Sequence, residues 1–97
     1  MSFVFHPEAE AEFEAAVAWY EEHEAGLGLD FASEVDATIR QALAMPLAWP
    51  ALDEGIRRVL VNRFPYGILY APSDDGIFIV GVMHLRREPD YWRKRLA

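Results

Sequence analysis

Residues 57–83, RRVLVNRFPYGILYAPSDDGIFIVGVM, decide the fold, because β-branched and aromatic residues cluster there in three successive runs. Such residues favour β-strands. The runs cover residues 59–61, 68–70 and 77–82. Asp74-Asp75-Gly76 is typical of a hairpin turn, and Pro65 requires a bend before the second run because proline cannot donate a ladder hydrogen bond. The stretch therefore predicts three antiparallel strands joined by short connections.

Two helices are expected before this stretch. Apolar residues recur at helical spacing from about residue 7 until Gly26 and Gly28 interrupt the pattern, and again over about residues 29–44. The remaining elements are an edge strand at residues 3–5, a loop over residues 45–54 and a helical tail at residues 90–95. We therefore predict a single domain over residues 1–97. It belongs to the α+β class, with an N-terminal helical hairpin packed on a small antiparallel β-sheet, order βααβββ, and a short C-terminal helix.

The composition excludes several kinds of chemistry. The chain has 97 residues and no cysteine, which rules out disulfides, a thiolate nucleophile and cysteine-ligated metals. Its three histidines lack the spacing of a helical metal site, so we expect no metal and no cofactor. The longest apolar run is far shorter than the roughly 18 residues of a membrane-spanning helix, and no secretory leader is recognised. We therefore predict a cytoplasmic protein without a membrane partner.

Charge is distributed unevenly along the chain. Residues 1–54 hold 12 acidic residues and one basic residue, whereas residues 55–97 hold four acidic and eight basic residues. The formal net charge of the whole chain is -7. Such asymmetry indicates two surfaces with different partners, although an acidic helical face can also serve only to keep a small protein in solution.

The basic residues of the second half include five arginines on or beside adjacent predicted strands. They are Arg57, Arg58, Arg63, Arg86 and Arg87. Antiparallel pairing can bring these arginines together, and guanidinium groups suit phosphates or the carboxylates of an acidic peptide. The alternative is that they pair with the acidic helices of the same chain.

His84, Tyr91 and Trp92 are further candidates for chemistry or binding. His84 follows the last strand, where it can act as a general acid or base beside the arginines, or can be a packed and hydrogen-bonded residue. Tyr91 and Trp92 can stack on a base or on a partner protein, or can cover the edge of the sheet.

Three segments carry a resemblance to a known family. They are residues 9–20, which end in Ala-Trp-Tyr, residues 57–66 (RRVLVNRFPY) and residues 84–92 (HLRREPDYW). With the order of elements, they resemble the RelE/ParE toxin superfamily over nearly the whole chain, and RFPY followed by HxRRxPxYW resembles its plasmid stabilisation members. The resemblance implies a cytoplasmic toxin of a type II toxin-antitoxin pair. It also implies neutralisation by a cognate antitoxin in a hetero-oligomer.

The superfamily contains RelE-type endonucleases, which cut mRNA on the ribosome, and ParE-type inhibitors of DNA gyrase. Gly67 stands where the nuclease branch has an arginine, and Leu60 where it has a basic residue. Without these cations, the scissile phosphate lacks charge stabilisation as the 2'-hydroxyl attacks. We therefore predict a ParE-like inhibitor with no catalytic residues. The alternatives are a RelE-like endonuclease and an antitoxin-binding protein without toxicity.

The candidate site residues follow from these alternatives. In the RelE-like alternative the catalytic residues are Arg58, His84, Arg86 and Tyr91. The residues expected to contact a partner, whether antitoxin, gyrase or ribosome, are basic and aromatic: Arg57, Arg58, Arg63, Arg86, Arg87, Tyr91, Trp92, Arg93 and Arg95.

Overall fold

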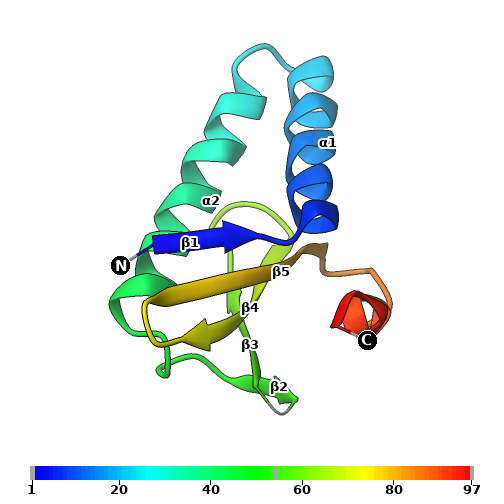
Figure 1. The fold of residues 1–97 in the computed structure, drawn as a ribbon. Helices are drawn as coiled ribbons and strands as arrows, with labels where there is room; N and C mark the ends of the chain where they lie inside the picture. The colour runs from blue at the N-terminus through cyan, green and yellow to red at the C-terminus, as the bar shows by residue number, and fades with distance from the viewer. Residues whose placement is uncertain (1, 54, 97) are drawn as a thin grey trace.

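The structure, a computed structural model, describes residues 2–53 and 55–96. Its elements in chain order are β1 (Ser2–Phe5), α1 (Pro7–His23), α2 (Leu27–Ala44), β2 (Ala51–Asp53), β3 (Ile56–Leu60), β4 (Tyr66–Ser73), β5 (Gly76–His84) and the 3-10 helix η1 (Tyr91–Leu96). Figure 1 shows α1 and α2 side by side on one side of the sheet. The predicted α+β class and the order βααβββ are confirmed, with one additional short strand, β2, between α2 and the three predicted strands.

The strands form one sheet in the order β1-β5-β4-β3-β2. The strands β3, β4 and β5 are antiparallel neighbours, as the three apolar runs predict. The connection between β3 and β4 contains Arg63, whose φ of 71° lies in the left-handed region, and the Val61 amide closes it by donating to the Tyr66 carbonyl at 2.9 Å. Short connections of this kind force consecutive strands to run in opposite directions.

The edge strand at residues 3–5 is present as β1, but it runs parallel to β5. The prediction of a wholly antiparallel sheet is therefore wrong at this edge, and the sheet is mixed. The reason is that no turn joins β1 to its neighbour, so the direction of β1 depends on where the helical hairpin returns the chain.

Three other predicted segments differ in detail. The expected loop over residues 45–54 contains the short strand β2, which pairs with β3 at Ala51 and Asp53. The C-terminal segment is a 3-10 helix. Gly28 lies inside α2 and does not interrupt the helix. A Cβ at this position would come 2.6 Å from the Val17 carbonyl oxygen of α1. Glycine at this position therefore allows α1 and α2 to approach closely.

Side chains from the two faces of the sheet enter two separate apolar clusters. The helix face packs Val59, Ile68, Tyr70, Ile79 and Val82 against buried residues of α1 and α2. Its aromatic centre is Phe31, whose ring lies 5.2 Å from that of Phe64 and 4.9 Å from that of Tyr66.

The opposite face packs a second set of sheet residues against Trp92 of η1. These are Ile56, Leu69, Val80 and Met83. The chain thus wraps around the sheet, with the helical hairpin on one face and the short C-terminal segment on part of the other. In the described residues, no helix is both long and apolar enough to cross a membrane.

Candidate functional site

The arginines predicted to converge do not form one cluster. Arg57 donates to two backbone carbonyls, those of Leu47 at 3.2 Å and Trp49 at 2.7 Å. Arg63 faces carboxylates of α2, with Asp30 at 3.6 Å and Glu34 at 3.7 Å. Arg63 therefore pairs with acidic side chains of the same chain, as the alternative interpretation predicts. Arg57 instead binds backbone carbonyls of the loop before β2.

Three arginines near the C-terminus also have acidic neighbours in the same chain. Arg87 lies 4.0 Å from Glu12, Arg95 lies 2.7 Å from the same carboxylate, and Arg93 pairs with Asp53. In contrast, the structure gives Arg58 and Arg86 no ion pair within residues 2–53 and 55–96. Arg57 has no carboxylate partner either, but backbone carbonyls hold its guanidinium, so Arg58 and Arg86 are the arginines to whose guanidinium groups the described chain gives neither an ion pair nor a hydrogen bond.

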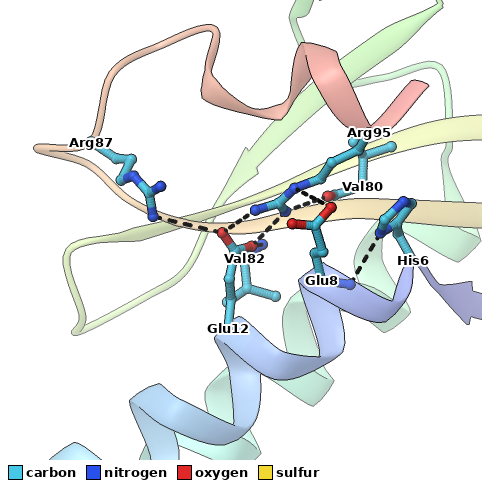
Figure 2. Close-up of polar contacts among 7 residues, drawn as sticks. All are labelled: His6, Glu8, Glu12, Val80, Val82, Arg87 and Arg95. Carbon is cyan, nitrogen blue, oxygen red and sulfur yellow. Dashed lines mark hydrogen bonds and ion pairs between the residues drawn. The ribbon is translucent and has the colours of Figure 1, made fainter. Parts of the chain in front are cut away.

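Glu12 and Arg95 form the most buried ion pair of the described chain, which we call the Glu12–Arg95 clasp (Figure 2). The side chain of Arg95 is 8% exposed and that of Glu12 is 17% exposed. Two parallel hydrogen bonds join them, from Nη1 to Oε1 at 2.9 Å and from Nη2 to Oε2 at 2.7 Å. Bidentate guanidinium–carboxylate pairs of this kind are geometrically specific. The clasp therefore fixes η1 to α1 across 83 residues of sequence.

The same two side chains complete the exposed edge of β5. The strand β1 covers β5 only as far as the pair Phe5 and Ile79. Beyond it, the Val80 carbonyl accepts a hydrogen bond from Arg95 at 2.9 Å, and the Val82 amide donates one to Glu12 at 3.0 Å. This part of β5 also contains a β-bulge, because the register with β4 skips Val80. Side chains thus take the place of a neighbouring strand.

Glu12 is a structural residue that the sequence analysis did not single out, because it lies in a run of glutamates. The spacing of residues along α1 does indicate that Glu12 is packed, since it follows the buried Ala9 by three residues and precedes the buried Ala16 by four. These are the spacings of one helix face. A carboxylate on the packed face of a helix needs a partner.

Tyr91 lies between the guanidinium groups of Arg87 and Arg95, which are 4.2 and 4.7 Å from its ring centroid. Its hydroxyl oxygen is buried and has no hydrogen-bond partner among the described residues. Burial raises the pKa of the Tyr91 phenol well above its ordinary range, and the Glu12 carboxylate adds to the effect, while the two arginines oppose it. A phenol held neutral in this way is a poor proton acceptor at neutral pH.

Trp92 and Arg93 follow Tyr91 in η1 but take different positions. Trp92 is buried against the sheet, and its indole N–H donates to the Pro89 carbonyl at 2.8 Å. The guanidinium of Arg93 lies over the Trp92 ring at 5.0 Å. The structure therefore places Trp92 in the apolar cluster on the sheet face opposite the helices and leaves Arg93 at the surface.

His84 ends β5 and stabilises the turn that follows it. Its Nδ1 accepts a hydrogen bond from the Arg86 amide at 3.1 Å, and its ring packs edge-on to Tyr66 at 5.1 Å between centroids. His84 is therefore the packed, hydrogen-bonded histidine of the two alternatives stated above.

A surface groove of about 590 Å3 runs between α1, the ends of β4 and β5, and the C-terminal segment. Its lining includes Ala15, Trp19, Tyr66, His84 and Tyr91. The groove lies at the edge of β5, because its lining includes Val82 of the helix-face cluster and Tyr91, which packs against the cluster on the opposite face.

Arg58 lies on the face of the sheet opposite the helices. It alternates along β3 with Val59, which faces the helices. Its stem passes over Gly67, where a Cβ would be 3.1 Å from Arg58 Cδ. Of the four residues of the nuclease alternative, His84 and Tyr91 line the groove. The sheet separates Arg58 from His84, whereas Tyr91 also packs against the apolar cluster on the face that carries Arg58.

Possible metal ligands are not gathered anywhere in the described residues, where no group of three or more histidine or acidic side chains has a suitable arrangement.

A comparison with solved structures finds a similar fold in a chain described as the chromosomal ParDE TA system from P. aeruginosa. The TM-score is 0.71 and the identity 19%, and the match covers 88% of this chain and 96% of that chain. A search of curated proteins finds no match. A family model described as "ParE toxin of type II toxin-antitoxin system, parDE" matches residues 3–89, which is nearly the whole chain. The chain therefore belongs to the ParE toxin family.

Proposed function

We propose that this protein is the toxin of a type II toxin-antitoxin pair that acts in the cytoplasm by inhibiting DNA gyrase. In this proposal it is neutralised by a cognate antitoxin, in a hetero-oligomer. The observation that carries the proposal is the match to the ParE toxin family over residues 3–89. The similarity in fold to a chain of a ParDE system supports a partner of the antitoxin class.

The arrangement of the charged residues supports inhibition by binding over cleavage of RNA. Phosphoryl transfer requires cations and a proton-transfer group within reach of the same phosphate. Arg58 and His84 are on opposite faces of the sheet, and Arg95 is occupied by Glu12. The neutral, buried Tyr91 phenol is also unsuited to act as a base at neutral pH.

The experiment that tests this function is tightly induced expression in a bacterial host, with separate pulse labelling of new DNA and new protein. Gyrase inhibition predicts that DNA synthesis stops first and that cells form filaments. Purified protein is then expected to block supercoiling of a relaxed plasmid by gyrase, and the antitoxin is expected to restore it. Loss of protein synthesis first, with cleaved mRNA, supports the endonuclease instead. Normal growth with intact antitoxin binding supports a protein without toxicity.

A further inference from the structure

The 3-10 helix η1 covers only part of the sheet face opposite α1 and α2. Next to it, Leu60 of β3 is 55% exposed and Leu85, just after β5, is 43% exposed. Leu60 shares its face with Arg58 and pairs with Gly67 of β4. The Leu85 amide donates to the Pro65 carbonyl at 2.9 Å, which continues the pairing of β4 with β5. We call Arg58, Leu60, Gly67 and Leu85 the open platform.

The side chain of Arg58 can lie close to the sheet because Gly67 beneath it has no side chain. A Cβ at Gly67 would lie 3.1 Å from Cδ and 3.2 Å from Cγ of Arg58, and 3.7 Å from Cδ2 of Leu60. The stem of Arg58 therefore occupies the space above Gly67 and carries the guanidinium beyond it. Long basic side chains often lie along apolar surface in this way, with the charged end free.

The charge of Arg58 has no counterpart in the described chain. Arg40, Arg63, Arg87, Arg93 and Arg95 all have carboxylate neighbours. Arg58 has none, although the chain carries 16 acidic residues. An arginine without a partner, beside exposed leucines on a rigid sheet, has the composition of a protein-binding surface and not of a solvated one.

We propose that the open platform is the surface by which this toxin binds its target protein, through a carboxylate of the target on Arg58 and an apolar side chain on Leu60 and Leu85. The inference rests on the proposed function. A flat patch on a sheet suits the surface of a folded protein, whereas an extended peptide gains more contact in the groove beside α1. Nucleic acid is disfavoured, since the unpaired Arg58 and Arg86 beside leucines, in a chain of net charge -7, cannot neutralise a row of phosphates.

The test compares purified variants in gyrase supercoiling, with antitoxin affinity measured separately by calorimetry. Arg58→Glu and Leu60→Asp are each expected to raise the half-inhibitory concentration at least tenfold, and to change antitoxin affinity less than threefold. Arg40→Glu is the matched control, since Arg40 is an exposed arginine on α2, and it is expected to stay within twofold of wild type. Leu60 is exposed, so Leu60→Asp keeps the test valid even if Arg58→Glu affects folding.

Each other outcome contradicts the inference in a different way. Unchanged inhibition by both variants overturns the platform while the proposed function stands. Lost antitoxin binding with unchanged inhibition assigns the surface to the antitoxin. If the wild-type protein binds plasmid in the absence of gyrase, and Arg58→Glu removes this binding, the platform is assigned to nucleic acid. A wild-type protein that leaves supercoiling unaffected overturns the proposed function itself.

Discussion

The two faces of the sheet are covered to very different extents. The helix face is covered by α1 and α2 and has an aromatic centre at Phe31 and Phe64. The opposite face is covered in part by the six residues of η1, through Trp92. The first arrangement concentrates buried apolar area, which stabilises the fold. The second leaves part of a rigid sheet accessible, which is where a protein that acts by binding needs a surface.

The largest loss of stability is expected on the helix face. Phe31→Ala removes a fully buried ring that contacts four other aromatic residues, Phe13, Tyr20, Phe64 and Tyr66. We expect the free energy of unfolding to fall by about 4 kcal/mol, as measured by urea denaturation. Leu29→Ala on the same helix is the control, because Leu29 is 70% exposed, and a change below about 0.5 kcal/mol is expected. Similar losses in both variants would contradict the assigned core.

The next largest effect is expected where the two faces are connected, at the Glu12–Arg95 clasp. Glu12→Ala leaves the Val82 amide without its acceptor and the buried Arg95 guanidinium with the Val80 carbonyl but no carboxylate to bind. We expect a loss of about 2 kcal/mol, below that of a fully buried pair because Glu12 keeps some exposure. Trypsin should then cut within η1 faster, because the segment is released.

The control for the clasp is Glu8→Ala. Glu8 is also near Arg95, at 3.9 Å, but its side chain is 65% exposed. Exposed ion pairs contribute little to stability, so both stability and the rate of trypsin cleavage should remain near wild type. Equal effects of the two substitutions would show that total charge, and not the clasp, holds the tail.

This contrast also separates what could be predicted from the sequence from what could not. The helices and the strands β3 to β5 follow from local periodicity and turn residues, so their order was predictable. The parallel direction of β1 was not, since no short connection fixes it. The role of Gly28 was not predictable either. The sequence pattern suggests a helix breaker, and the close approach to Val17 that requires glycine involves a residue of another helix.

The candidate site was less predictable than the fold for the same physical reason. The arginines can be recognised in the sequence by their charge, but their partners are remote in sequence, as with Arg95 and Glu12. The sequence of β3 shows that Arg58 and Val59 face opposite sides of the sheet. The separation of Arg58 from His84 depends in addition on which face of the sheet the helices cover. Charge in a sequence identifies candidates, and only packing decides which of them remain free.

A smaller effect is expected where η1 crosses β5. A Cβ on Gly81 would come 2.9 Å from the Tyr91 hydroxyl oxygen and 3.3 Å from Leu69 Cδ1. Gly81→Ala should therefore cost about 1 kcal/mol, since the neighbouring side chains must move. In the Tyr91→Phe background the cost should be smaller, because the closest atom is gone. A cost that is the same in both backgrounds would place the strain at Leu69 instead.

The smallest effect at neutral pH is expected for Tyr91→Phe itself. The buried hydroxyl has no hydrogen-bond partner in the described chain, so its removal breaks no bond and relieves a desolvation cost, and stability should not fall and should rise by less than about 1 kcal/mol. A difference should develop in alkali. Burial and Glu12 raise the pKa of this phenol in the folded state, so the folded protein keeps a proton that the unfolded chain loses above about pH 10.

Stability of the wild type should therefore fall with rising pH above about 10, because the folded state then binds more protons than the unfolded state. Burial also raises the pKa values of Tyr20, Tyr66 and Tyr70, so the Phe variant should fall as well, but less steeply. Urea denaturation of both proteins from pH 7 to 11 measures the difference in slope. Parallel curves would mean that the Tyr91 phenol reaches water in the folded state, and hence that η1 detaches from β5 much more readily than the clasp implies.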